Sequence, residues 1–303
     1  MKTVNSLSGG KTSSYMAANY PADYNVFALV TIEDKKCLFS DKKIRQQVSD
    51  KIGREFIGTV EDDMIIYTML DLEQFIGSEI TWVAGKTFEK VITNKNGKTY
   101  ISQVNRRTCS SEMKVVPIAQ WWYQNIKEPV EMRIGFRANE QRRAKTMLNK
   151  LNDNGYGTEK IMIEKTENKN NKWKTFEWRV PSFPLIKDAI YRDKIVEYWK
   201  GKPIRFAKFN NCIGCFHAED LFLKHQSTRH PKKFNWFIEQ EKKSMRDYKG
   251  RQWKSGHPTY EPLQRAHHCR QNRARATARQ MLLCDIANRY PANASPAEQP
   301  RVD

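Results

Sequence analysis

The chain has 303 residues, of which 39% are hydrophobic and eight are tryptophan, so it is long enough to bury the core of one large domain or of one domain with an appendage. Its formal net charge of +19 favours polyanionic partners, nucleic acid among them. It contains neither an apolar run of about 18 residues nor a charged-then-apolar leader, so neither a membrane span nor secretion is expected, and a cytoplasmic location follows.

The chain opens with a short apolar run, Met1 to Val4, and continues with Ser-Leu-Ser-Gly-Gly-Lys-Thr-Ser-Ser over residues 6–14 and a helix expected over 13–20. A strand, a glycine turn and a helix N-terminus in this order predict a phosphate cradle, because the turn exposes backbone N–H groups and the helix dipole attracts anions. It is not a Walker A loop, since Asn5 stands where that motif needs its first glycine. An ordinary glycine turn is the alternative. The expected phosphate-binding residues are Ser8, Gly9, Gly10, Lys11, Thr12, Ser13 and Ser14.

The segments that follow alternate between patterns typical of strands and patterns typical of helices. Residues 26–32 are a continuous apolar run of the kind found in a strand buried on both faces, and helices are expected over 41–52 and 61–75. Asn96-Gly97 between residues 91–93 and 99–101 predicts a hairpin turn. A helix interrupted early by Pro117 is expected over 109–126, a strand over 130–136 and a helix over 139–151. This order predicts a doubly wound α/β fold with a mostly parallel sheet and a β-hairpin insertion.

Beyond residue 151 the expected elements are strands at 161–163 and 175–180 around a polar loop at 166–172, and helices at 188–199, 217–226 and 231–247. From residue 255 onward the composition changes, with seven arginines, eight alanines and no lysine among 49 residues. We therefore expect an α/β domain over 1–210, a cysteine-pair and helical region over 211–254, and a basic, weakly ordered tail over 255–303.

Charged residues gather where a predicted strand ends, in Gly-Phe-Arg-Ala-Asn-Glu-Gln-Arg-Arg over residues 135–143. Arg137 at the strand end, with Arg142 or Arg143 on the first helical turn, can hold a phosphate or sulfate through paired charged hydrogen bonds. A surface salt bridge between Arg137 and Glu140 is the alternative.

Three cysteines form a candidate metal centre. Cys212 and Cys215 lie in Asn-Cys-Ile-Gly-Cys-Phe-His over residues 211–217, and such a C-x-x-C turn directs two thiolates at one point. Cys109 can join them only if the sheet brings the start of its helix against that turn, where Arg106, Arg107 and the helix dipole would stabilise its thiolate. Three buried structural cysteines are the alternative. We expect Cys37 to be structural, and His225 and His230 to be surface or core residues.

Four segments in the same order resemble the PP-loop ATP pyrophosphatase superfamily, and in particular its PAPS reductase-like family. Residues 8–14 resemble its S-G-G-K-x-S loop, with Thr12 where aspartate is usual, and residues 135–143 resemble its G-x-R-x-x-E-x-x-R element. Residues 106–117 resemble its C-C-x-x-R-K-V-x-P segment, with Ser110 at the second cysteine and Lys114 at the lysine. The cysteine pair is similar to that of the iron–sulfur branch.

The resemblance implies a sheet of the HUP or PP-loop type that binds ATP or a related adenine nucleotide, accompanied by Mg²⁺, with Lys114 among the nucleotide-binding residues. It also implies a [4Fe–4S] cluster held by Cys109, Cys212 and Cys215, with the fourth iron position open or filled by His217, Cys269 or Cys284. Zinc is the alternative metal.

The leading hypothesis for function is a nucleotide-dependent transferase. ATP would activate an oxygen or a phosphate by adenylation, and sulfur would displace AMP on a nucleic acid, tRNA or DNA. Lys11 and Arg137 would stabilise the charge that develops at phosphorus. One alternative is a reductase of adenylylsulfate- or PAPS-type sulfonucleotides, although the C-terminal E-C-G-I/L-H motif of true PAPS reductases is absent. Another is a non-catalytic nucleotide-sensing or DNA-binding component of a modification or defence complex. No membrane partner is expected, and the sequence does not define an oligomeric state.

Overall fold

A six-stranded sheet organises the chain in the computed structural model, which describes residues 1–104, 107–165 and 171–265. Its strand order is β3-β2-β1-β4-β6-β5, and every neighbouring pair is parallel except β5 with β6. The predicted α/β class with a mostly parallel sheet is confirmed. The strands are β1 (Thr3–Leu7), β2 (Tyr24–Ala28), β3 (Ile80–Val83), β4 (Val130–Ile134), β5 (Gly157–Lys165) and β6 (Asn171–Ser182).

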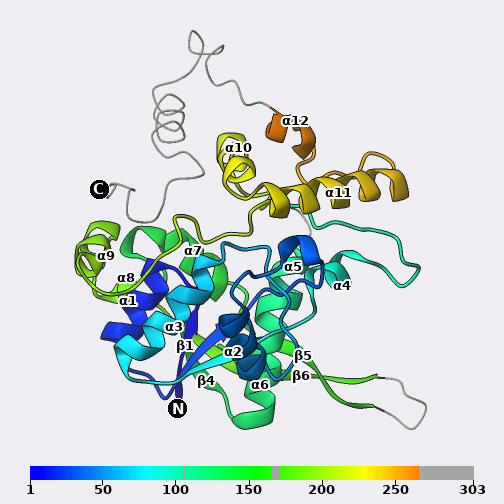
Figure 1. Cartoon of the computed structure of the whole chain (residues 1–303). Coiled ribbons are helices and arrows are strands. Elements are labelled where there is room, and N and C mark those ends of the chain that lie inside the picture. Colours follow the sequence, from blue (N-terminus) through cyan, green and yellow to red (C-terminus); the bar gives the residue numbers. More distant parts are fainter. Residues whose placement is uncertain (105–106, 166–170, 266–303) are drawn as a thin grey trace.

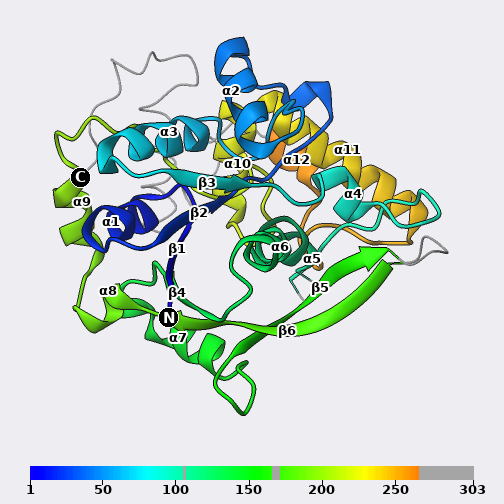
Figure 2. The same ribbon diagram turned by 90° about the horizontal axis from the view of Figure 1, so that it is seen from below.

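Helices cover both faces of the sheet (Figure 2). Apolar residues of one face share a core with α1 (Lys11–Asn19), α2 (Lys42–Ile52), α3 (Met64–Ile76) and α9 (Arg192–Trp199). The other face packs on α6 (Val116–Asn125) through a core that includes Val4, Val26 and Trp122. This two-sided burial explains why β2 leads into the apolar run of residues 26–32 rather than into an alternating pattern. The short α7 (Gln141–Leu148) and α8 (Pro184–Lys187) follow β4 and β6.

Three C-terminal helices lie across one end of the sheet, opposite the N-terminus (Figure 1): α10 (Asp220–Arg229), α11 (Pro231–Asp247) and α12 (Tyr260–Arg265). Their core includes Val30 and Ile32, which follow β2, so the predicted regions 1–210 and 211–254 share buried apolar surface. The first residues of the predicted tail also belong to this core. Tyr260 is fully buried and its hydroxyl donates a hydrogen bond of 3.2 Å to the Gly214 carbonyl. Residues 266–303 of that tail lie outside the described residues.

The two strands predicted at 91–93 and 99–101 do not form, so the predicted hairpin is wrong. The first of them is occupied by α4 (Phe88–Ile92), and a single antiparallel bridge between Thr93 and Thr99 flanks the expected turn. The hairpin of this fold is instead β5–β6, on either side of the polar loop. Sequence reasoning also missed β3, and placed the start of α9 too early. Ala189, inside that predicted helix, has a φ of 51°, which is incompatible with a continuous right-handed helix.

The segment predicted as one interrupted helix over 109–126 has three parts. A short α5 (Thr108–Ser110) continues into the π-helical segment η2 (Ser111–Val115) and then into α6. Pro117 is the second residue of α6, and its ring removes one N–H that would otherwise bond to the preceding turn. The π-helical turn therefore absorbs the interruption, and the three parts run on as one helical segment.

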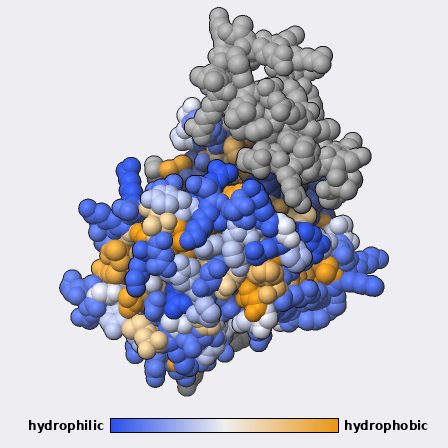
Figure 3. All heavy atoms as spheres, turned by 90° about the vertical axis from the view of Figure 1, so that its left-hand side faces the viewer, coloured by the Kyte–Doolittle hydropathy of each residue, from blue (hydrophilic) through white to orange (hydrophobic). Residues whose placement is uncertain are grey.

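Polar side chains dominate the face of the molecule shown in Figure 3, where hydrophobic residues are scattered between them. Within the described ranges, none of the helices is both long enough and apolar enough to cross a membrane.

Candidate nucleotide site and cysteine centre

The predicted cradle lies at the carboxyl end of β1. Gly9 has a φ of 74°, in the left-handed region, and Gly10 is the N-cap of α1, which begins at Lys11. A Cβ atom at Gly9 would collide with Ile65 on α3, and one at Gly10 would collide with the side chain of Asn210. Only glycine therefore fits the turn as it is packed. The first backbone N–H groups of α1 have no hydrogen-bond partner within the helix.

The cradle hydroxyls divide into two kinds. Ser13 Oγ accepts a hydrogen bond of 3.1 Å from Ser8 N and donates one of 3.2 Å to the Gly10 carbonyl, so this hydroxyl holds the turn itself. Ser14 is fully buried, and no partner for its hydroxyl exists among the described residues. Ser8 and Lys11 are exposed and Thr12 is half-buried. The groups open to a ligand are therefore Lys11, Thr12, the backbone and Ser8, whose hydroxyl also lies 3.1 Å from Ser13 Oγ.

Positive groups gather close to the cradle. Although the Lys11 side chain is exposed, protein atoms around its ammonium group remove part of its hydration, and this partial burial and, after it, the nearby Arg192 lower its pKa. Burial and Arg229 do the same to Lys208, two residues before the Asn210 side chain that covers Gly10. His225 follows this trend, because burial and then Lys208 and Arg229 lower its pKa to about 4. Cations that lower one another's pKa in this way would be stabilised by an anion placed among them.

The predicted arginine element packs against the cradle. A Cβ atom at Gly135 would lie 3.3 Å from Ser13 Cα, so the end of β4 touches the start of α1. Arg137 Nε lies 3.0 Å from Glu140 Oε2, and Arg143 also pairs with Glu140. Arg142 is exposed. The ion pair weighed as an alternative for Arg137 is thus present, and Glu140 holds two of the three candidate arginines.

The two distant cysteine segments meet under α11 (Figure 1). Cys109 and Cys212 both pack against the core that contains Phe234 and Trp236 of α11. A Cβ atom at Gly214 would collide with the Phe237 ring, so glycine between the cysteines lets the turn lie against this helix. Burial raises the pKa of the Cys212 thiol well above its usual value, and the charges of Glu61, Cys215 and Cys109 raise it further.

A buried ion pair borders the cysteines. Lys114 Nζ lies 2.9 Å from Glu61 Oε1, and Glu61 is only 2% exposed. Burial lowers the pKa of Lys114, but Glu61, Cys212 and Cys215 outweigh burial and the pKa is raised. Lys114 therefore lies beside the thiols. Sequence reasoning did not single out Glu61, whose only signal was the acidic run 61–63 at the start of a predicted helix.

The thiols converge without forming a ready metal site. No three His, Cys, Asp or Glu side chains in the described part of the chain form a group that could hold a metal ion as they stand. Burial raises the pKa of Cys215 as well, while the His217 backbone N–H, directed at its sulfur, and Arg107 oppose that shift. Cys37 is fully buried with a pKa raised to about 12, outside this group. Arg106, Cys269 and Cys284 lie outside the described residues.

The cradle and the cysteine centre are joined by one short stretch of chain. Glu61 faces Lys114 and Cys212, and Ile65, four residues on, contacts Gly9. Four residues span at most about 14 Å even when fully extended. One ligand of nucleotide size can therefore reach from the first site towards the second.

Comparisons with protein-family models, with curated proteins and with solved structures found no match to this chain.

Proposed function

We propose that this protein binds ATP or a related adenine nucleotide, together with Mg²⁺, at residues 8–14, in a fold of the PP-loop type. The observation that carries the proposal is the position of the cradle: a glycine turn between β1 and α1, at the strand where the sheet order β3-β2-β1-β4 changes direction. Open α/β sheets bind ligands at the carboxyl ends of the strands beside such a point. Polyphosphate fits the N–H groups and cations found there.

The proposed reaction is adenylation followed by sulfur transfer to a nucleic acid. Lys11 stabilises negative charge at the phosphates, and its lowered pKa returns towards the usual value when they bind. Arg137 contributes once its guanidinium exchanges Glu140 for phosphate oxygen. The short path from Ile65 to Glu61 supports a reaction shared between the cradle and the cysteine centre.

The proposed cofactor is a [4Fe–4S] cluster with Cys109, Cys212 and Cys215 as its thiolate ligands, and zinc is the alternative. A cluster would supply an iron position to which sulfur can bind. In this chain Lys114 lies beside the thiols and would offset part of the negative charge of the bound thiolates. Anaerobically purified protein is expected to be brown, and to lose its visible absorption in Cys109→Ala and Cys212→Ala but not in Cys37→Ala. Colourless protein with stoichiometric zinc would replace the cluster with a structural metal.

Sulfonucleotide reduction has less support. That reaction needs a thiolate that attacks sulfur, and the C-terminal E-C-G-I/L-H motif that carries it in true PAPS reductases is absent from this chain. Thiol-dependent sulfite release from adenylylsulfate would favour reduction over sulfur transfer. Nucleotide binding without pyrophosphate or sulfite release would leave a non-catalytic sensor.

The decisive experiment is a calorimetric titration with ATP and Mg²⁺. Lys11→Ala removes charge, and Gly10→Val places side-chain atoms where the backbone must approach phosphate and where Asn210 lies. We expect the double variant to lose at least tenfold in affinity. Lys36→Ala, which removes an exposed lysine paired with Glu239, is the matched control and should bind as the unmodified protein does. Equal affinity in a folded double variant would remove the nucleotide from this site.

A further inference from the structure

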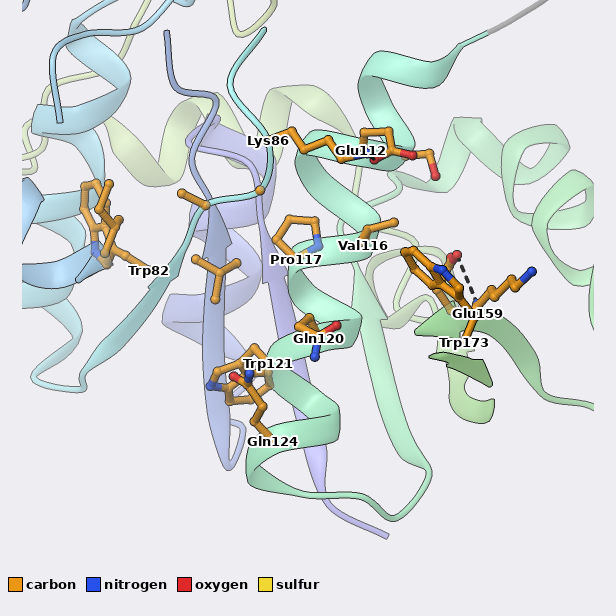
Figure 4. Close-up of a pocket in the computed structure, with 16 residues that line it drawn as sticks. Trp82, Lys86, Glu112, Val116, Pro117, Gln120, Trp121, Gln124, Glu159 and Trp173 are labelled. Atoms are coloured by element: carbon orange, nitrogen blue, oxygen red, sulfur yellow. Dashed lines mark hydrogen bonds and ion pairs between the residues drawn. The ribbon is translucent and has the colours of Figure 1, made fainter. Parts of the chain in front are cut away.

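A ligand-sized groove lies along α6 (Figure 4). It is a groove of about 700 Å³, within the size range of small-molecule sites. Its floor is the near side of α6, with Val116, Pro117, Gln120, Trp121 and Gln124. The end of β3 forms one wall and the β5–β6 hairpin forms the other. None of the cradle residues lines it.

The hairpin wall carries an open aromatic surface. Trp173 on β6 is 47% exposed, and it lies beside Val116 at the edge of the groove. A large indole left half in water is a platform on which a planar ring stacks. Trp121, on the floor, is packed edge-on against Tyr24, with ring centroids 5.3 Å apart, and adds apolar surface.

Two carboxylates face the groove. Glu112 pairs with Lys86 at 2.8 Å, which leaves that charge balanced. Glu159 forms no salt bridge with any residue that the structure describes, and its carboxylate accepts only a long backbone bond of 3.3 Å from Lys160. Burial raises the pKa of Glu159 and Glu112 raises it further, while the Lys160 backbone N–H and the nearby Arg179 offset only part of this rise. An N–H group of a ligand placed beside Glu159 would relieve this cost of burial.

We propose that this groove binds one unstacked base of a single-stranded nucleic acid, which stacks on Trp173 and donates its exocyclic amine to Glu159. The net charge of +19 attracts a polyanion and repels a cationic peptide, the other ligand with N–H donors for a carboxylate. Lys160, which also lines the groove, serves a phosphate beside the base.

The groove also adjoins the cysteine centre. Ser111 and Glu112 of η2 line it, whereas Cys109 and Met113 of the same helical segment pack in the core beneath α11. A strand bound in the groove would therefore lie across one helical segment from the thiols. The base site needs no nucleotide in the cradle, so it can be tested whether or not ATP binds.

The test uses fluorescence anisotropy with labelled nonamers, T9 and T4CT4, and the full-length protein. We expect T4CT4 to bind more tightly, because thymine lacks an exocyclic amine. Trp173→Ala should weaken binding of both about fivefold or more, and Trp173→Phe should restore most of it. Glu159→Gln should bind T9 normally and lose the preference for T4CT4.

Tyr191→Ala, which removes another half-exposed aromatic ring, should leave both affinities unchanged. Wild-type affinity in a folded Trp173→Ala variant would overturn the proposal. The proposal would also be overturned if a lysine- and arginine-rich peptide bound in the groove without displacing either nonamer.

Discussion

Glu61 connects the two chemical features of the molecule. Its carboxylate holds Lys114 beside the cysteines, and its backbone carbonyl accepts a hydrogen bond of 2.7 Å from Lys233, which also pairs with Asp63. A carboxylate that is 2% exposed is stable only while these cations stay in place. We therefore regard Glu61 as a positioning residue for the cysteine centre.

Glu61→Gln should destabilise the protein. It removes one partner of an ion pair in which the Lys114 side chain is 36% exposed, so solvent screens part of the loss and about 1–3 kcal/mol of unfolding free energy is expected. Urea denaturation measures it. The control, Glu239→Gln, breaks an exposed pair with Lys36 and should leave the midpoint unchanged. Equal midpoints in both variants would show that Glu61 does not stabilise this centre.

His225 makes stability depend on pH. Its pKa is about 4 in the folded state against an ordinary value of 6.5, because burial and two nearby cations oppose its charge. Between these values the unfolded chain binds a proton that the folded chain does not, so acid favours unfolding. The stabilising contribution is complete above pH 6.5 and is lost as pH falls towards 4.

The melting temperature of His225→Leu should accordingly fall by less than that of the unmodified protein when the pH is lowered from 7.5 to 5. Thermal unfolding followed by circular dichroism at the two pH values measures the difference. His257→Leu, which replaces an exposed histidine, should behave as the unmodified protein does. Parallel pH profiles for all three proteins would contradict the assignment.

Elements with a strong local signal were predicted well. The helices α2, α3 and α11 begin and end within about three residues of the predicted bounds, because their apolar periodicity agrees with their packing. The strand β3 was missed because it has four residues, too few for a pattern. The strands around Asn96-Gly97 were wrong because α4 buries Phe88 and Ile92 in the C-terminal core, a tertiary gain that local propensity does not show.

The candidate site divides in the same way. The glycine turn and the C-x-x-C turn are local, so the sequence showed both. Glu61, Lys208 and Trp173 gain their significance from neighbours far along the chain, which no spacing rule predicts. Even for Arg137, the sequence offered phosphate and Glu140 as alternatives, and only packing shows that the ion pair forms in the chain without ligand.

The boundary of the C-terminal helical layer can be tested by truncation. A chain that ends at residue 254 lacks Tyr260, which is fully buried and whose backbone N–H donates a hydrogen bond of 2.6 Å to Glu241. Loss of a buried aromatic side chain costs about 3–5 kcal/mol. We expect that chain to melt well below one that ends at residue 265. Equal melting temperatures would mean that α12 contributes nothing to the fold.

The net charge of the whole molecule determines its attraction to a polyanion. Six arginines and three acidic residues lie in 266–303, so a chain ending at residue 265 keeps a formal charge of +16 out of +19. Most of the charge therefore belongs to the part that folds around the sheet. Attraction to nucleic acid should then be a property of the folded body rather than of the arginine-rich tail.

We expect the full chain to bind tRNA with an affinity that falls steeply as salt rises from 50 to 200 mM, because each phosphate neutralised by lysine or arginine releases counterions. The chain ending at residue 265 should keep most of the log–log slope, since it keeps most of the charge. Anisotropy titrations at four salt concentrations measure both slopes. If truncation abolishes the slope, the tail carries the nucleic-acid contacts; if the full chain shows no salt dependence, a small nucleotide is its only anionic ligand.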